Sequence, residues 1–141
     1  SSYSVSVVAA TNFEIVSCVI QNASAGDFLF NGIMVDGTSG PASAAIDNVT
    51  ISLNAIGPAA NYPMGIGAKD QAIVVMTSGS VTTQMANHQD TSVQAGGSAA
   101  ISLKYLTVTS SNLALSTDAR SNIYLTGCTI VGKTSGNIHQ V

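Results

Sequence analysis

Residues 122–132 read NIYLTGCTIVG, and apolar and polar side chains alternate along the first half of this run. Such alternation indicates a β-strand with one buried side. A similar stretch, NFEIVSCVI, occupies residues 12–20, and the tetrapeptide SAAI occurs at residues 43–46 and again at 98–101. The offset between the first two stretches is twice the offset between the SAAI copies. Because half of the SAAI offset is close to one coil of a parallel β-helix, these spacings predict a chain of stacked coils.

Short alternating runs also occur at residues 4–7, 49–53 and 101–105. Turn-forming residues separate these runs, which predicts roughly ten short strands and an all-β domain. The continuous apolar run IVVM at residues 73–76 is typical of a strand that is buried on both sides. One stretch, residues 83–88, is compatible with a helix but is too short to change the fold class.

Glycine and proline mark the expected breaks between strands. We predict loops or weakly structured connections at residues 36–41, 57–63, 65–69 and 94–97. The pair Ser78-Gly79 is interpreted as a tight hairpin turn.

We expect one all-β domain over residues 1–141, folded as a short parallel β-helix-like stack. A β-sandwich or jelly roll is the alternative, because both architectures accommodate these strands. Residues 1–11 are interpreted as an N-terminal arm or donor strand, since they alternate and precede the first expected turn.

The stretch at residues 122–132 resembles a coil of the right-handed parallel β-helix proteins, which include pectate-lyase-like enzymes and phage tailspikes. Residues 12–22 resemble such a coil as well, and residues 99–110 do so less closely. The resemblance implies a stack of about five coils, whose ends need capping or partner chains. It implies a fold more than a function, because such folds include lyases, hydrolases and structural fibres.

Only 11 of the 141 residues are charged, which is 8% of the chain, compared with about 25% in an average soluble domain. The basic residues form no stripe, so no nucleic-acid partner is expected. No apolar run approaches the length of about 18 residues that a membrane-spanning helix needs, so no membrane partner is expected either. A chain with so little charge is predicted to pack against itself or against other proteins.

The sequence does not predict a catalytic site, a cofactor or a metal centre. The carboxylates are scattered along the chain and show no spacing typical of a glycosidase pair; they are Glu14, Asp27, Asp36, Asp47, Asp70, Asp90 and Asp118. We interpret them as turn caps, most clearly Asp27, Asp36 and Asp90, and Asp118 with Arg120 as a surface ion pair.

Two histidines are conceivable metal ligands. His88 and Asp90 would lie on one side of a strand, but two ligands are too few unless a symmetry axis multiplies them, as an axial His88 or His139 in a trimer could. No serine lies in a nucleophile elbow. The prediction is therefore a protein that is not an enzyme.

Cys18 and Cys128 lie within apolar runs near opposite ends of the sequence. We favour buried free thiols, with a disulfide as the alternative. A β-helix would separate the two residues along the stack.

Three functions are compatible with these features. The first is a non-catalytic structural or assembly protein of a virion, either a phage tail-spike or fibre module or a capsid decoration protein. Its partners are other copies of the chain, with a trimer favoured by family analogy, and other virion proteins. The second is an extracellular filament or pilus-like subunit that assembles by strand addition. The third is a carbohydrate-binding or carbohydrate-cleaving β-helix domain.

Overall fold

The computed structural model describes residues 2–21, 30–55, 63–85 and 89–141. The described chain is all-β, and every strand pairing in it is parallel. Parallel pairing throughout agrees with the predicted β-helix-like stack and excludes the antiparallel sandwich. The strands are β1 (Ser2–Val8), β2 (Phe13–Val16), β3 (Val19–Gln21), β4 (Phe30–Ala55), β5 (Met64–Met85), β6 (Thr91–Gly96), β7 (Ala100–Lys104), β8 (Thr107–Thr117), β9 (Asn122–Thr126), β10 (Thr129–Ser135) and β11 (Ile138–Gln140).

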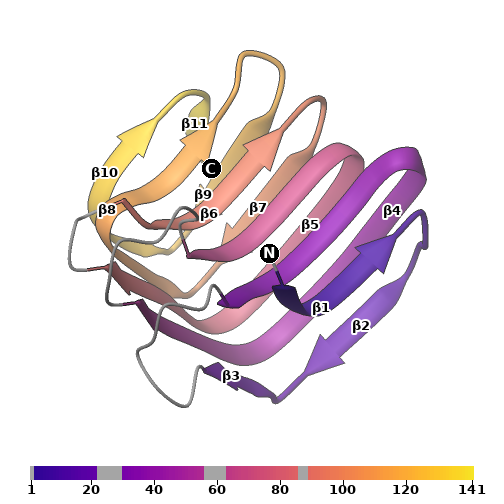
Figure 1. The fold of residues 1–141 in the computed structure, drawn as a ribbon. Coiled ribbons are helices and arrows are strands. Elements are labelled where there is room, and N and C mark those ends of the chain that lie inside the picture. Colours follow the sequence, from indigo (N-terminus) through magenta and orange to yellow (C-terminus); the bar gives the residue numbers. More distant parts are fainter. Residues whose placement is uncertain (1, 22–29, 56–62, 86–88) are drawn as a thin grey trace.

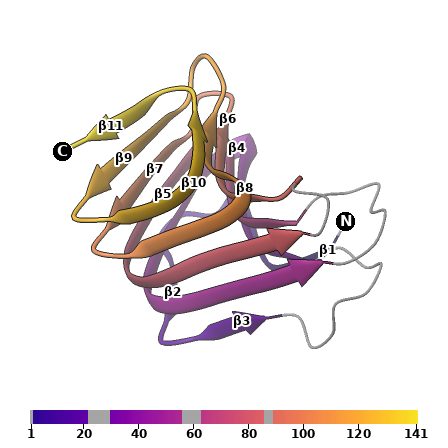
Figure 2. The same ribbon diagram turned by 90° about the vertical axis from the view of Figure 1, so that its left-hand side faces the viewer.

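The strands wind as coils stacked on one another, and each coil has three sides (Figures 1 and 2). The coils are numbered in chain order: coil 1 is residues 2–21, coil 2 is 30–55, coil 3 is 64–85, coil 4 is 91–110, coil 5 is 113–131, and the partial coil 6 is 133–140. Face A contains β1, β6 and the paired segments of β4, β5, β8 and β10. Face B contains β2, β7, β9, β11 and the middle of β4 and β5. Face C contains β3, the last part of β4 and β5, and the first part of β8 and β10.

The strand register explains the repeats in the sequence. On face B, Ile15 is followed in successive coils by Ile46, Met76, Leu103 and Leu125. These four steps add up to the offset between the similar stretches at residues 12–20 and 122–130, which therefore occupy equivalent positions four coils apart. The two SAAI copies are slightly out of register with each other, because Ile46 aligns with Leu103 and not with Ile101.

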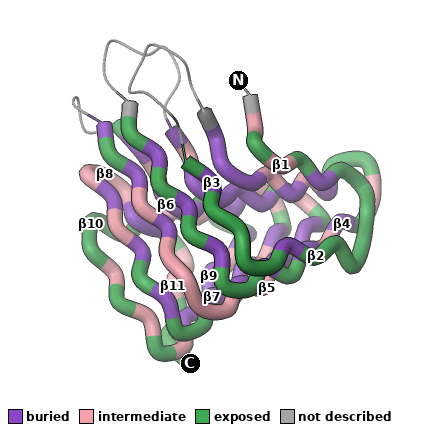
Figure 3. The backbone as a smooth tube through the Cα atoms, turned by 90° about the horizontal axis from the view of Figure 1, so that it is seen from below, coloured by how far each residue is buried: buried purple, intermediate pink, exposed green. Residues whose placement is uncertain are grey.

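The core is a narrow column of aliphatic side chains inside the coils. Alternate residues of each strand point inward, and Figure 3 shows buried positions alternating with exposed ones along the tube. Ile33, Ile66 and Val93 fill the interior on face A, and Ile51 and Val81 fill it on face C; all five are at most 1% exposed. Small and β-branched residues suit this interior because the coil leaves little room between its faces.

A ladder of left-handed residues forms the corner between faces B and C. Ser17, Asn48, Ser78, Tyr105 and Gly127 occupy this corner in successive coils, and their φ angles lie between 52° and 60°. One residue in this conformation redirects the backbone without a loop. The expected hairpin at Ser78-Gly79 is therefore wrong, because the chain turns a corner there and continues parallel to its neighbours.

Two further expectations are wrong. Residues 65–69 are not a connection but part of β5, where Ile66 and Ala68 enter the core. Gly65 reflects close backbone approach, since a Cβ there would lie 2.6 Å from the carbonyl oxygen of Ser92 in the next coil. The run at residues 73–76 is buried on its inner side only, because Ile73 is 59% exposed.

Two other predicted breaks fall at corners of the stack but lie mostly within strands. β4 continues through the predicted break at residues 36–41, where its register with β5 shifts between Gly37 and Ala42. Residues 94–96 of the predicted break at residues 94–97 belong to β6, and a turn begins at Gly97. Residues 56–62 and 86–88, and with them most of the predicted connection at 57–63 and the end of the helix-compatible stretch, lie outside the described residues.

The N-terminal stretch and the cysteines have defined places. Residues 2–8 form β1, which pairs with β4 of the same chain. Both thiols are free; Cys18 is exposed, contrary to expectation, and Cys128 is half-buried with Sγ 3.2 Å from the carbonyl oxygen of Leu103. Four coil steps of about 4.8 Å separate the two cysteines, too far for a disulfide. Within the residues described, no helix is long and apolar enough to cross a membrane.

Candidate functional site

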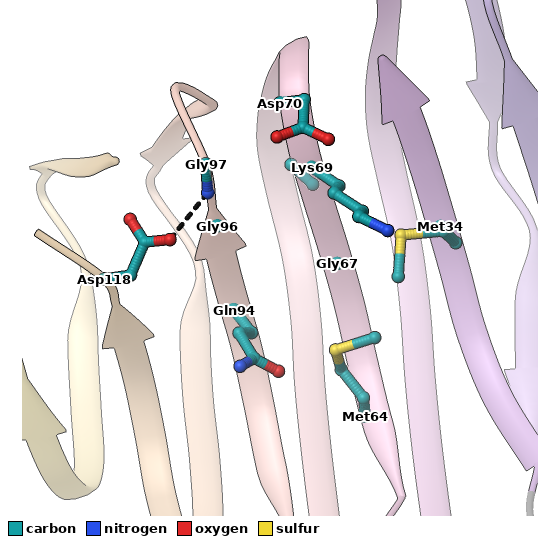
Figure 4. A pocket seen from close by; sticks show the side chains of 10 residues that line it. Met34, Met64, Gly67, Lys69, Asp70, Gln94, Gly96, Gly97 and Asp118 are labelled. Carbon is teal, nitrogen blue, oxygen red and sulfur yellow. Dashed lines mark hydrogen bonds between the residues drawn. The ribbon is translucent and has the colours of Figure 1, made fainter. Parts of the chain in front are cut away.

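A groove of about 310 Å³ runs along the outer side of face A (Figure 4). Its floor is Gly67, where a Cβ would lie 2.6 Å from Cε of Met64 and 2.7 Å from Cε of Met34. The methyl groups of Met34 and Met64 occupy the space that a side chain at this position would need. Residues of coils 2 to 5 line the groove: Met34, Met64, Gly67, Ala68, Lys69, Asp70, Gln94, Gly96, Gly97 and Asp118.

Two carboxylates lie at the end of the groove, on either side of Gly97. Asp118 accepts hydrogen bonds from the backbone N–H of Gly97 at 2.6 Å and of Arg120 at 3.1 Å, and from the Ser121 hydroxyl at 2.9 Å. These donors, with the Gly97 N–H first, lower the pKa of Asp118 to about 2. Asp118 is thus ionised at neutral pH and cannot serve there as a general acid.

Asp70 approaches Gly97 from the other side. Its backbone is left-handed with a φ of 56°, and its Oδ2 accepts a hydrogen bond from the Thr38 hydroxyl at 2.8 Å. A Cβ added to Gly97 would overlap Oδ1 of Asp70, so the glycine is required for this approach. With Lys69 and Gln94, the groove offers acceptors, a cation and an amide to a polar ligand.

A second polar cluster is fully enclosed and surrounds Asp90, which is 0% exposed. Its Oδ2 accepts hydrogen bonds from the hydroxyls of Thr83 at 2.7 Å and Ser110 at 2.6 Å, and from the backbone N–H of Ser111 at 3.0 Å. The Ser111 hydroxyl donates to Oδ1. Burial pushes the pKa of Asp90 upward, but the bonds from Ser110, Ser111 and Thr83 outweigh it and the pKa lies below its usual value.

This cluster joins three segments of the stack and leaves nothing free for chemistry. Thr83 lies at the end of coil 3, Asp90 precedes coil 4, and Ser110 ends coil 4. No buried side-chain nitrogen or oxygen among the described residues lacks a hydrogen-bond partner. The cluster therefore ties successive coils together, and it is more than the turn cap that the sequence predicts for Asp90.

The remaining candidate residues are dispersed. Asp36 caps a turn as expected, with its Oδ1 2.8 Å from the Thr38 nitrogen. Arg120 contacts Asp118 through its backbone N–H. His139 is exposed, with Nε2 2.9 Å from Oδ1 of Asn122 and its ring stacked on Tyr124 at 5.0 Å.

The part of the chain that the structure describes contains no group of three His, Cys, Asp or Glu residues able to hold a metal ion. Asp27 and His88 lie outside the described residues.

We expect the free energy of unfolding to decrease as the pH falls from about 4 to about 2. The pKa values of Asp90 and Asp118 are lower in the folded chain than the ordinary 3.8. Above that value both carboxylates are ionised and contribute their full stabilisation, which is lost as the pH falls through the folded pKa. Urea denaturation at a series of pH values measures this, and equal stability at about pH 2.5 and about pH 7 would contradict it.

The outer side of face B has exposed apolar side chains near its centre. Its centre is Ile73 on coil 3, with half-buried Val75 beside it. Small residues flank them in the neighbouring coils: Ser43 and Ala45 in coil 2, and Ala100 and Ser102 in coil 4. Nothing in the described chain covers this side of the sheet, and Ile73 is therefore exposed to solvent.

Comparisons of the chain with protein-family models, with curated proteins and with solved structures found no match in any of the three.

Proposed function

We propose that this chain is a non-catalytic structural protein that acts through self-association, as a component of a virion. The observation that carries the proposal is the uncovered outer side of face B. Ile73 is 59% exposed at its centre, and complete burial of such a side chain contributes about 1.5–3 kcal/mol. Covering this side with another protein removes apolar surface from water on a sheet that is already ordered, so little conformational entropy opposes association.

The electrostatics support a non-catalytic role. Asp118 is held ionised by turn hydrogen bonds, and Asp90 is saturated by hydroxyl and backbone donors. A general acid or base needs a pKa near the working pH and a path to substrate, and neither carboxylate has both.

The assignment to a virion rests on the low charge and on the resemblance of residues 122–132 to phage tailspike coils. The runner-up is an extracellular filament subunit that assembles by strand addition. Gold-labelled antibody against the chain, viewed by electron microscopy in its source, tests both. We expect label on virus particles, at the shell, tail tip or fibre, whereas label confined to cell-surface filaments would favour the runner-up.

The groove on face A supports a second candidate function, the binding of a carbohydrate. A hollow lined by carboxylates, an amide and a lysine suits the hydroxyl groups of a sugar polymer. If the groove has this role, Asp70→Asn and Gln94→Ala each weaken polysaccharide binding roughly tenfold, because the first replaces an acceptor oxygen with a donor and the second removes an amide.

Calorimetry against bacterial polysaccharides measures this effect, with Lys133→Ala outside the groove as the matched control. Binding without cleavage is expected, because Asp118 cannot supply a proton. Release of reducing ends, lost in Asp70→Asn, would show instead that the groove is catalytic.

A further inference from the structure

We propose that face B pairs with face B of a second copy of this chain, with the two stacks antiparallel and related by a two-fold axis that runs along the strands of coil 3. This inference rests on the proposed self-association and names its surface and symmetry. The order of the residues that point outward from face B supports this arrangement.

The outward residues of face B form columns along the stack. One column reads Val16, Asp47, Thr77, Lys104 and Thr126 in coils 1 to 5. Asp47 and Lys104 are both exposed and lie one coil below and one coil above Thr77. Charges of opposite sign are thus placed symmetrically about coil 3.

A two-fold axis along the strands of coil 3 keeps each column facing itself and reverses the order of the coils. Asp47 of one copy then faces Lys104 of the other, and Lys104 faces Asp47, which gives two equivalent ion pairs. Isologous interfaces require this kind of self-complementarity.

The neighbouring columns fit the same axis. Ile73 and Val75 lie on coil 3 itself, so each meets its own counterpart at the centre of the interface. Ala45 of coil 2 faces Ser102 of coil 4, and these small side chains leave room for the isoleucine and valine. In coil 1, the carboxylate of Glu14 faces coil 5 of the second copy at Tyr124, whose hydroxyl is a hydrogen-bond donor.

The size of the face fits a weak, reversible dimer. The axis on coil 3 sets coils 1 to 5 of one copy against coils 5 to 1 of the other, and coil 6 lies outside the interface. Five coils at about 4.8 Å and strands of about five residues at about 3.3 Å give roughly 400 Å² per copy, or about 800 Å² for both. That is the size of weak and transient interfaces, so association is expected to be reversible.

A trimer around an axis parallel to the stack makes a different prediction. Such an axis brings coils of equal height together, so Asp47 does not face Lys104. Within one chain the two residues are two coils apart, about 10 Å, where their interaction is largely screened. Within its own chain, the carboxylate of Asp47 accepts a hydrogen bond from the Ser78 hydroxyl at 3.4 Å.

A charge swap tests the proposal, with the dissociation constant measured by sedimentation equilibrium. We expect Asp47→Lys and Lys104→Asp each to weaken association roughly tenfold to thirtyfold, because each replaces two attractions with two repulsions. The double variant, which restores both pairs in reverse, should return the dissociation constant to near the original. Lys133→Asp in β10 on face A makes the same change in net charge as Lys104→Asp and should have little effect.

A second pair of variants examines the apolar centre. Ile73→Asp should abolish association, and Val131→Asp, a similarly exposed position on face C, should not. Thermal unfolding of each variant confirms that it is folded. A wild-type chain that is monomeric overturns the proposed function itself. Association that is insensitive to the single reversals, or that the double variant does not rescue, overturns this inference and leaves self-association standing.

Discussion

Replacing Asp90 with alanine is expected to lower the free energy of unfolding by about 3–5 kcal/mol. The carboxylate is fully buried and accepts hydrogen bonds from Thr83, Ser110 and Ser111. Its removal leaves those donors without acceptors in an interior that water does not reach, which costs about 1–3 kcal/mol for each group. Because the donors belong to coil 3 and to the end of coil 4, the stack should lose its tie at the corner where these coils meet.

Urea denaturation of Asp90→Ala, with Asp90→Asn beside it, measures this effect. The asparagine keeps one acceptor oxygen and the shape of the side chain, so its loss of stability should be the smaller of the two. Lys133→Ala is the exposed control, since Lys133 lies on face A, outside the proposed interface. If Asp90→Ala were no less stable than Lys133→Ala, the enclosed cluster would not be a tie between coils.

Gly79→Ala is expected to destabilise the chain by about 3 kcal/mol or more, from overpacking together with an unfavourable φ. Gly79 has a φ of 93°, and a Cβ there would overlap the carbonyl oxygen of Val49 in the coil below. The colliding atoms are backbone atoms, so no side-chain rotation can relieve the contact. Coils 2 and 3 would have to move apart at the corner between faces B and C.

Gly40→Ala provides the matched control, because a Cβ at that position meets only Cβ of Ala9 at 3.6 Å. The same substitution at an open position of β4 should change the midpoint of thermal unfolding little. Equal midpoints for the two variants would mean that Val49 and Gly79 are not neighbours in adjacent coils.

Alternation and spacing were sufficient to predict the class of the fold. The run at residues 122–126 forms β9 with the expected inward residues, and the offset between residues 12–20 and 122–130 corresponds to four coils. The corners were harder to predict. Ser78-Gly79 reads as a hairpin because a small residue followed by glycine permits positive φ, whether the chain then reverses or only turns a corner.

Exposure on face B could not be inferred from hydrophobicity. Ile73 and Val74 are both β-branched and apolar, yet Val74 is fully buried and Ile73 is not. A sequence pattern reports which residues can be buried, whereas the number of layers around a sheet decides which of them are. The outer side of residues 73–76, which the sequence predicts to be buried, belongs to the surface that we propose as the interface.

Neither polar site has a local signature. Asp70 and Asp118 are far apart in the sequence and meet only because the coils place both beside Gly97. Asp90 accepts hydrogen bonds from Ser110 and Ser111 because the chain passes beside it again after one coil. The number of residues per coil decreases along the stack, because the step from Leu103 to Leu125 is shorter than the step from Ile15 to Ile46. The sequence alone therefore does not provide the register that brings these groups together.

The central claim is that the folded chain joins other copies of itself. Sedimentation equilibrium of the purified chain, from about 1 µM to about 100 µM, measures this most directly. We predict a mass that rises reversibly above the 14.2 kDa of one chain as the concentration increases. A mass of 14.2 kDa at every concentration would contradict the account.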